Sequence, residues 1–208
     1  MEATWSAPSA ERIKYLSDDE LRAFFDVIRA NPKDRARKRD LAMFSLALAY
    51  GLRETEAITL RLEHINLPEH QLYIQRLKRR GKGGRWYDIS EGNLRVLKSW
   101  LKERAKYTNA RSNPWLFISQ MSGSGHLSAD RLYGAFKRYA AAAGIPGMYP
   151  HCLRFTCGVR LAKAGFSAFQ IQSRLGHASV LSSAVYVQLG HPDRIEQDRR
   201  ADEALRVL

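Results

Sequence analysis

Residues 150–186, PHCLRFTCGVRLAKAGFSAFQIQSRLGHASVLSSAVY, contain the pattern that decides the fold. Pro150 is typical of a helix start, and apolar residues follow it at helical spacing. Ser167 and Gln170 form a capping box for a second helix, and Gly176 ends that helix. The predicted helices of this region cover 151–164, 168–175 and 179–188. The C-terminal third of the chain is therefore expected to be helical.

The sequence before this region is also mostly helical, with one change of period. Residues 71–77 and 85–89 have the alternating pattern of strands, and the glycine-rich stretch 80–84 between them predicts a β-hairpin. The other predicted helices cover 18–30, a segment ending near Tyr50, 54–60, a segment around 94–101, and 128–143. Ser17 and Glu20 form a capping box for the first of these helices, and Gly51 breaks the second. The expected fold class is mostly α with a small antiparallel β-sheet (α+β).

The chain of 208 residues shows no internal repeat, no low-complexity tract and no linker long enough to separate two large domains. One domain is therefore expected over residues 17–190. A short extension, 1–16, precedes it. In the tail, 191–208, charged residues of both signs alternate with apolar ones, which predicts a terminal amphipathic helix.

The charge of the chain predicts a polyanionic partner. There are 34 Lys and Arg against 21 Asp and Glu, a formal net charge of +13. The sequence holds no H-E-x-x-H, no paired Cys-x-x-Cys and no acidic triad at metal spacing, so metal-dependent nuclease chemistry is disfavoured. No apolar run is long enough for a membrane span, and no signal peptide is evident. The two cysteines, Cys152 and Cys157, are too far apart on one helix for a relaxed disulfide, which fits a reducing, cytoplasmic setting.

The predicted hairpin is strongly basic and glycine-rich. It contains no acid, so contact with phosphate is favoured over a solvated turn. Its spacing does not match a phosphate-binding P-loop, and strands rather than a strand and a helix flank it, so nucleotide hydrolysis is not supported. Its basic residues are Arg76, Lys78, Arg79, Arg80, Lys82 and Arg85.

Other candidate site residues are weak signals when each is taken alone. His151 and Arg154 share one face of a helix at its first turn, where a phosphate could also be bound by free backbone N–H groups. His177 follows a helix stop, and Tyr186 stands nine residues later, where a core or surface role is the more common one. Arg53 follows a helix-breaking glycine and is interpreted either as a structural ion pair with Glu56 or Glu54, or as a fixed phosphate ligand.

Taken in chain order, these residues resemble the catalytic domain of the tyrosine recombinase (phage integrase) family. The resemblance covers about residues 15–188. Within the family, the chain is most similar to the short fimbrial-inversion type or to a minimal phage integrase. Many relatives carry a separate N-terminal DNA-clamping domain, whereas only about 16 residues precede the first predicted helix here. The matched contexts are G-L-R-x-x-E at Arg53, R-L-K at Lys78, H-x-L-R at His151 and Arg154, L-G-H at His177, and Tyr186.

The resemblance implies site-specific recombination through a 3′-phosphotyrosyl link to DNA, with Tyr186 as nucleophile. Arg53 and Arg154 would grip the non-bridging phosphate oxygens, because a guanidinium is planar and always charged. The histidines at 151 and 177 would bond the phosphate and assist proton transfer. Lys78 would be the general acid, with Lys82 as the fallback, and Glu56 would orient the basic groups.

The same resemblance implies double-stranded DNA as partner, no metal or other cofactor, and a bacterial or phage-encoded protein in the cytoplasm. The tail would pass to a neighbouring protomer in a tetramer on two DNA sites, with a monomer free in solution and a possible accessory DNA-bending or directionality factor. The rest of the hairpin and a basic run would hold the flanking DNA backbone. That run comprises Lys33, Arg35, Arg37, Lys38 and Arg39.

Two alternatives stay open at the level of sequence. A type IB topoisomerase-like enzyme shares the tyrosine and the basic pocket but relaxes DNA without exchanging strands; the short chain and its tail favour the recombinase. A non-catalytic DNA-binding regulator of the same fold is the other, and the complete set of six catalytic residue types argues against it.

Overall fold

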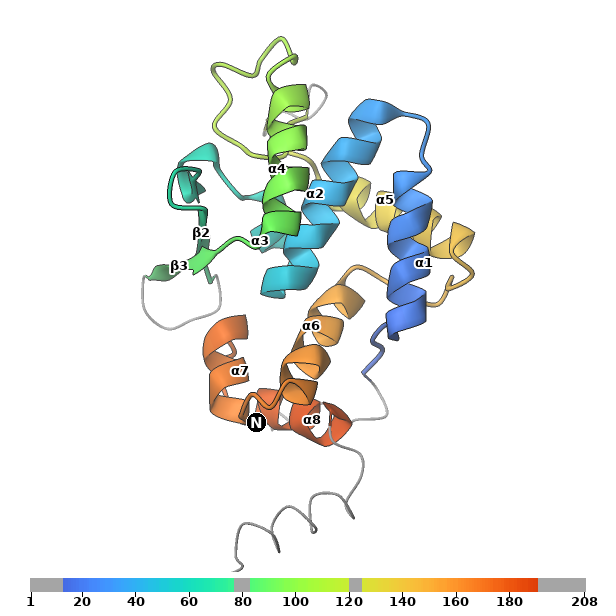
Figure 1. The fold of residues 1–208 in the computed structure, drawn as a ribbon, viewed down its shortest axis with the longest axis vertical. Helices are drawn as coiled ribbons and strands as arrows, with labels where there is room; N and C mark the ends of the chain where they lie inside the picture. The colour runs from blue at the N-terminus through green and yellow to red at the C-terminus, as the bar shows by residue number, and fades with distance from the viewer. Residues whose placement is uncertain (1–12, 77–82, 120–124, 191–208) are drawn as a thin grey trace, which may run out of the picture.

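The computed structural model describes residues 13–76, 83–119 and 125–190 (Figure 1). Its helices are α1 (Asp18–Arg29), α2 (Asp34–Tyr50), α3 (Glu54–Ile58), α4 (Glu91–Arg104), α5 (Ala129–Ala142), α6 (His151–Lys163), α7 (Ala168–Leu175) and α8 (Leu181–Gly190). Its strands are β1 (Ile65–Asn66), β2 (Gln71–Gln75) and β3 (Gly84–Asp88). The predicted fold class, mostly helical with a small antiparallel sheet, is confirmed. The two-residue strand β1 was not predicted, because so short a strand has no readable alternation.

Helix α2 lies in the middle of the helical part, packed between α4 and α6 (Figure 1). Its side chain Phe44 meets Phe24 of α1 and Phe136 of α5 in one aromatic cluster with ring centroids 4.7–5.7 Å apart. These rings are at most 1% exposed. Burying aromatic rings supplies much of the hydrophobic free energy of a core of this size. The end of α2 is therefore a rigid base for the loop that carries Arg53.

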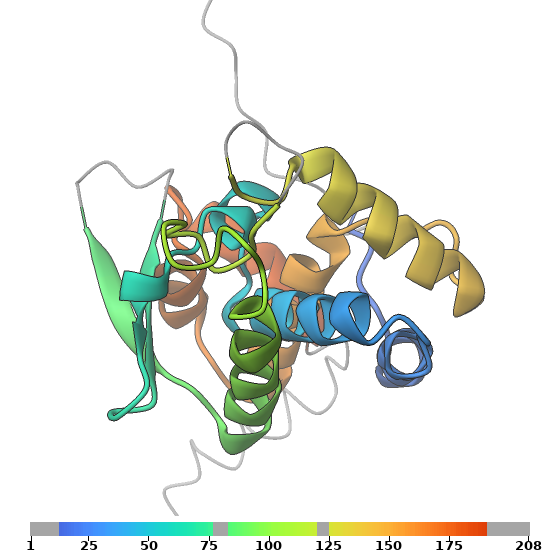
Figure 2. The same cartoon turned by 90° about the horizontal axis from the view of Figure 1, so that it is seen from above.

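The sheet has the order β1-β2-β3 and lies to one side of the helices, away from α1 and α5 (Figure 2). In the hairpin, Leu72 pairs with Tyr87 and Ile74 pairs with Arg85. Leu72 and Ile74 are buried against the helices. Tyr73, which lies between them, pairs with Trp86, and the Trp86 side chain is exposed. The predicted β-hairpin is confirmed, and its turn lies outside the described residues.

The predicted helix ends are confirmed by their hydrogen bonds. Ser17 and Ser167 both open capping boxes, with Glu20 and Gln170 as the reciprocal partners. Gly51 and Gly176 end α2 and α7 with φ values of +57° and +66°, a left-handed conformation that favours glycine. Both glycines stand directly before segments that carry predicted site residues.

Helix α8 packs tightly on α6 because α6 has a glycine at the contact. A Cβ built on Gly158 would lie 2.8 Å from three ring atoms of Tyr186. On the same helix, Cys152 and Cys157 are buried and free, so the prediction of no disulfide is confirmed. Among the described residues, no helix has the length and apolar character needed to cross a membrane.

The contact at Gly158 gives a prediction about stability. Gly158→Ala should lower the free energy of unfolding by about 1–3 kcal/mol, because the added methyl group overpacks the Tyr186 ring. Gly134→Ala is the matched control: it also lies within a helix, but its Cβ would meet only Arg138 Nη1, at 3.6 Å. The control should be neutral or slightly stabilising. Urea denaturation of both variants measures the difference, and equal effects would contradict the packing argument.

Candidate active site around Glu56

A buried carboxylate organises the candidate site. Glu56 of α3 has a side chain 1% exposed, and its Oε1 accepts a bond from Arg53 Nη1 at 2.7 Å. Its Oε2 accepts bonds from the Arg53 backbone N–H at 3.0 Å and from Arg76 Nη1 at 2.9 Å. Nη1 of Arg154, on α6, lies 4.0 Å from the same Oε2. Glu56 thus gathers guanidinium groups from three separate parts of the chain.

The last carbonyl groups of α7 bind the same three arginines. These oxygens have no partner within their own helix, and the negative end of the helix dipole favours a cation there. The bonds run from Arg76 Nη2 to Arg174 O at 2.5 Å, from Arg154 Nη2 to Leu175 O at 2.8 Å, and from Arg53 Nη2 to Gly176 O at 3.3 Å. The end of α7, and with it the position of His177, is therefore fixed on the arginine cluster.

Two further carbonyl groups, at the end of α2, complete the support. Arg154 Nη1 donates to Gly51 O at 2.5 Å, and Arg76 Nη2 donates to Tyr50 O at 2.7 Å. Burial, with Arg53 and Arg76 adding to it, lowers the pKa of Arg154 to about 10. Arg154 therefore keeps its charge at neutral pH despite being 1% exposed.

The charge on Glu56 follows from the balance of two effects. Burial opposes ionisation of the carboxyl group, but Arg76 and Arg53 outweigh it and hold the pKa of Glu56 below its usual 4.5. Three guanidinium groups around one carboxylate leave two positive charges without an acidic partner inside the cluster. Such a cluster is suited to bind a phosphate group.

His177 and Tyr186 lie together beside these arginines. The two rings are stacked, with centroids 5.8 Å apart and planes 20° apart. Ser183 of α8 fixes the imidazole, since its Oγ is 2.7 Å from Nδ1. Burial, followed by Arg154 and other cations, lowers the pKa of His177 to about 3. The imidazole is consequently neutral at physiological pH and can serve as a hydrogen-bond partner.

Tyr186 is 2% exposed and lies close enough to Arg154 and Arg53 for both to affect its ionisation. Burial is the largest effect, and it raises the pKa of Tyr186 to about 12 although both arginines act in the opposite direction. The phenol is therefore protonated at neutral pH. Any reaction in which its oxygen attacks requires a group that accepts this proton.

His151 begins α6 on the same side of the cluster as Arg154. Its ring is edge-on to Phe155, with centroids 4.8 Å apart, and it is among the groups that lower the pKa of His177. Phe155 in turn lies against Tyr186, with centroids 6.4 Å apart. The structure thus brings together Arg53, His151, Arg154, His177 and Tyr186.

One of the predicted hairpin residues is buried. Arg76 was predicted to contact DNA, but it is 6% exposed and its guanidinium is bonded to Glu56 and to two backbone carbonyls. The structure therefore moves Arg76 from the hairpin surface to the support of the cluster, and its contact with DNA stays an untested prediction. Arg85 is exposed, lies over the Tyr87 ring at 4.4 Å and bonds Ser173, so its contact with DNA stays a prediction. Lys78, Arg79, Arg80 and Lys82 lie outside the described residues.

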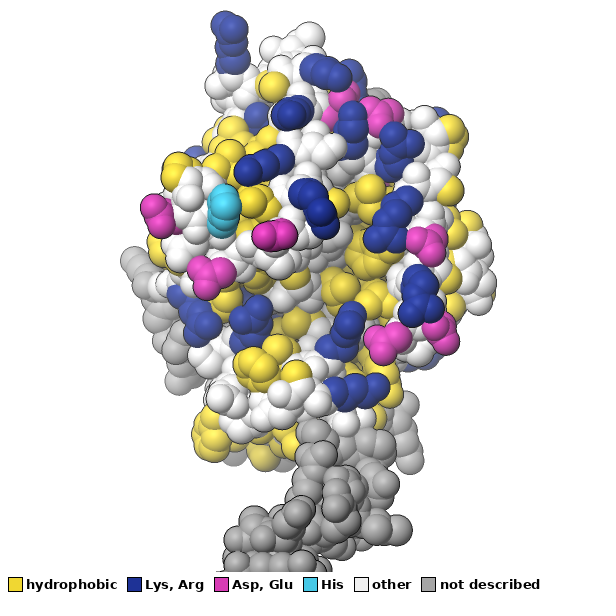
Figure 3. All heavy atoms as spheres, in the orientation of Figure 1, with side chains coloured by type: hydrophobic (Ala, Val, Ile, Leu, Met, Phe, Trp, Pro, Cys, Tyr) yellow, Lys and Arg dark blue, Asp and Glu magenta, His cyan; other side chains and the backbone are white. Residues whose placement is uncertain are grey.

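The basic run at 33–39 is only partly neutralised, because three acids, Asp34, Asp40 and Glu103, are shared among four of its residues and Lys106. Arg37 and Lys38 bind Asp34, Arg39 binds Asp40, Arg35 binds Glu103, and Lys38 also lies near Glu103. Figure 3 likewise shows Lys and Arg side chains interspersed with Asp and Glu on the face that carries α4. Of the run, Lys33 is exposed and has no ion pair among the described residues. The predicted DNA contacts of this run stay predictions, and the run contributes no residue to the candidate active site.

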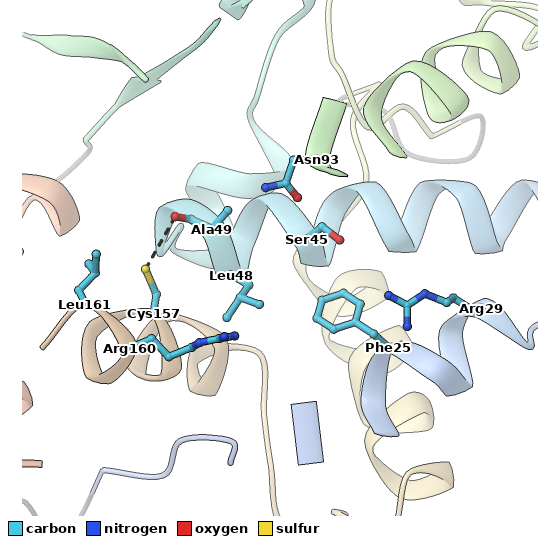
Figure 4. A pocket seen from close by; sticks show the side chains of 9 residues that line it. All are labelled: Phe25, Arg29, Ser45, Leu48, Ala49, Asn93, Cys157, Arg160 and Leu161. Atoms are coloured by element: carbon cyan, nitrogen blue, oxygen red, sulfur yellow. Dashed lines mark hydrogen bonds between the residues drawn. The ribbon is translucent and has the colours of Figure 1, made fainter. Parts of the chain in front are cut away.

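A separate hollow of about 380 Å³ opens between α1, α2 and α6 (Figure 4). Its lining includes Phe25, Leu48 and Arg160, and it reaches Cys157, whose Sγ lies 3.9 Å from Ala49 O. Burial raises the pKa of Cys157 to about 11, so this thiol is protonated at neutral pH and is not a competing nucleophile. No member of the arginine cluster lines the hollow.

Sequence reasoning missed three contributions to the site. The supporting role of Arg76 had no signal, because its acceptors are distant in sequence. Ser183 had none either, since a serine six residues after a histidine is common. Gly158 had a usable signal, because a glycine inside a predicted helix often marks a close contact.

Glu56→Gln tests the support of the cluster. The variant should lower the free energy of unfolding at pH 7 by about 3–5 kcal/mol, because buried guanidinium groups lose their counter-charge. The pKa of Glu56 in the folded protein is below 4.5, so wild type loses this stabilisation as the pH falls below 4.5 and the carboxylate takes up a proton. The difference in free energy of unfolding between wild type and variant should therefore be smaller at acid pH. Denaturant titrations at pH 7 and at acid pH measure it.

Asp19→Asn is the control for this variant. Asp19 also pairs with an arginine, Arg22, but both side chains are at least 70% exposed. Its effect should stay within about 0.5 kcal/mol at either pH. The role given to Glu56 would be contradicted if Glu56→Gln lowered the free energy of unfolding as little as the control does, or if its effect did not change with pH.

Comparisons with known proteins agree with this site. Residues 14–191 match the model of the phage integrase family. The type 1 fimbriae regulatory protein FimB of Escherichia coli K12 is 31% identical over 150 residues, which cover 71% of this chain and 72% of FimB. Tyrosine recombinase XerA of Pyrococcus furiosus is 31% identical over 179 residues, which cover 85% of this chain and 57% of XerA.

Two solved structures share the fold. The crystal structure of XerA recombinase has a TM-score of 0.73 at 22% identity, covering 99% of this chain and 68% of that one. XerH recombinase, solved on a palindromic difH substrate as a post-cleavage complex, has a TM-score of 0.73 at 26% identity, covering 90% and 52%. This chain therefore belongs to the phage integrase family of tyrosine recombinases, enzymes of site-specific recombination that break and rejoin DNA.

Proposed function

We propose that this chain cleaves and rejoins double-stranded DNA through a covalent 3′-phosphotyrosyl intermediate formed by Tyr186. The observation that supports it best is the stacking of Tyr186 on His177 beside Arg53, which is bonded to Glu56, and Arg154, which is bonded to two backbone carbonyls. Strand exchange needs no outside energy source in this scheme, because the phosphodiester energy is kept in the phosphotyrosyl bond.

In the first step, the Tyr186 oxygen forms a bond to the scissile phosphorus and the bond from phosphorus to the 5′-oxygen breaks. Arg53 and Arg154 stabilise the negative charge that develops on the non-bridging oxygens. We assign acceptance of the phenolic proton to His177, which is neutral at physiological pH and stacks on Tyr186, and a hydrogen bond to the phosphate to His151. The 5′-hydroxyl of the second DNA strand then reverses the step and releases Tyr186.

The 5′-oxygen is a poor leaving group and needs a proton as it departs. We assign this general acid to Lys78, with Lys82 as the alternative, because both belong to the hairpin that begins beside the cluster. Lys78 stands two residues after Arg76, which is bonded to Glu56. Arg85 and Lys33 are assigned to contacts with the flanking DNA backbone.

The proposed self-association of the protein on DNA rests on the amphipathic sequence of the tail. Residues 191–208 of this tail lie outside the described part of the chain. We propose that the tail passes to a neighbouring protomer, so that four subunits join two duplexes, with a monomer in the absence of DNA. An accessory factor would set direction. Joining of strands from two duplexes separates this function from topoisomerase-like relaxation, which leaves partners unchanged.

Tyr186→Phe tests the nucleophile. Wild-type protein incubated with a nicked suicide duplex that carries its recombination core should form a protein–DNA band on a denaturing gel, and Tyr186→Phe should form none. The substitution removes only the attacking oxygen and keeps the ring that packs against Gly158. Tyr133→Phe is the matched control, since Tyr133 is 46% exposed on α5, and it should react like wild type. A band from Tyr186→Phe would refute the assignment.

A substrate with a 5′-bridging sulfur tests the general acid. A thiolate leaves without a proton, so this substrate should restore cleavage to the variant that lacks the acid and to no other variant. Lys78→Ala should be rescued and Lys82→Ala should not. The measurement is the single-turnover cleavage rate of each variant on the sulfur and the ordinary substrate, and rescue of Lys82→Ala alone would reverse the assignment.

A further inference from the structure

The two oxygens of Glu56 are used unequally by the three arginines. Oε1 is bonded to Arg53 at 2.7 Å. Oε2 is bonded to Arg76 at 2.9 Å, whereas Arg154 stays 4.0 Å from it, beyond hydrogen-bond distance. Oε2 also accepts the Arg53 backbone N–H, and both Nη groups of Arg154 donate to backbone carbonyls instead. Arg76, and not Arg154, is therefore the guanidinium bonded to Oε2.

Arg76 is held in this position by more than the carboxylate. Its Nη2 donates to backbone carbonyls at the ends of α2 and α7, at 2.7 and 2.5 Å. Its aliphatic stem lies on Gly176, where an added Cβ would come within 2.6 Å of Arg76 Cγ. Its guanidinium carbon is 5.9 Å from the centre of the Tyr87 ring. A side chain with this many constraints has one placement, and that placement faces Glu56 and away from solvent.

We propose that Arg76 is a positioning residue, which occupies Oε2 of Glu56 and so keeps Arg154 available to the scissile phosphate. The inference rests on the proposed function. Without Arg76, Oε2 would keep only the Arg53 backbone N–H, and Arg154 Nη1 lies 4.0 Å from this oxygen in a buried site, where an ion pair forms readily. Arg154 would then turn toward Glu56, and the excess of positive charge in the cluster would fall from two to one.

The test compares two substrates that differ in their need for positive charge. One suicide duplex has an ordinary phosphate at the cleavage position. The other has a methylphosphonate there, in which a methyl group replaces a non-bridging oxygen, so the group is neutral and depends less on the arginines. The variants are Arg76→Gln, which removes the charge, and Arg76→Lys, which keeps a cation beside Oε2.

Arg76→Gln should slow single-turnover cleavage of the phosphate substrate on the order of 10²-fold, and that of the methylphosphonate substrate about tenfold or less. Arg76→Lys should keep more of the rate than Arg76→Gln. The slope of DNA affinity against salt concentration should not change, since a positioning residue does not contact DNA. All assays are run at a temperature at which each variant is shown to be folded.

Arg104→Gln is the matched control for loss of a buried arginine. Arg104 is 4% exposed and donates to the carbonyls of Ala110, Asn113 and Trp115. Arg104→Gln should lower the free energy of unfolding, as Arg76→Gln does. It should change the cleavage rates of the phosphate and the methylphosphonate substrates by the same factor. If it does not fold, Arg104→Lys takes its place.

Three results would overturn the inference. They are equal losses for Arg76→Gln on the two substrates, no advantage of Arg76→Lys over Arg76→Gln, and a salt slope lowered by about one, which indicates a direct phosphate contact. A wild-type protein that forms no covalent product on the phosphate duplex contradicts the proposed function instead. The variants of Arg76 cannot produce that result, so the two failures are distinguishable.

Discussion

One buried carboxylate constrains the whole catalytic side of this protein. Glu56 is nearly inaccessible to water, and a charge in such a place is tolerated only when it is paired and fully hydrogen-bonded. Arg53 and Arg76 meet that requirement with hydrogen bonds, Arg154 adds a positive charge 4.0 Å away, and each arginine comes from a different segment. The carboxylate therefore does more than stabilise: it forces the end of β2, the start of α3 and the first turns of α6 to converge on one point.

The arginines transmit this constraint to the residues that lie nearest the proposed chemistry. Through the final carbonyl groups of α7 they fix the turn that holds His177, and His177 in turn stacks on Tyr186. Helix α8 also packs against α6, where Gly158 has no side chain and so leaves room for the Tyr186 ring. Tyr186 is thus held by packing, which also raises the pKa of its phenol through burial, while the arginines that act in the opposite direction come from elements far away in sequence.

Much of the fold was readable from the sequence because its signals are local. Capping boxes at Ser17 and Ser167, and left-handed glycines at 51 and 176, set helix ends without help from tertiary contacts. The residues matched to the family were likewise readable from order and spacing. The partners of those residues were not, because burial decides them: a basic run that looked like a DNA contact is partly paired with acids, and Arg76 is inside the protein.

The acceptors that hold the arginines are mostly main-chain oxygens. Those of Tyr50, Gly51, Arg174, Leu175 and Gly176 belong to the backbone, so their bonds do not depend on the side chains at these positions. Substitution at residue 174 or 175 leaves the acceptor in place as long as the helix keeps its path. The donors have less freedom, because the planar fork of a guanidinium carries five N–H groups, more than any other side chain. The positions that supply the carbonyl acceptors can therefore change their side chains without loss of these bonds, whereas the positions that supply the arginine donors cannot.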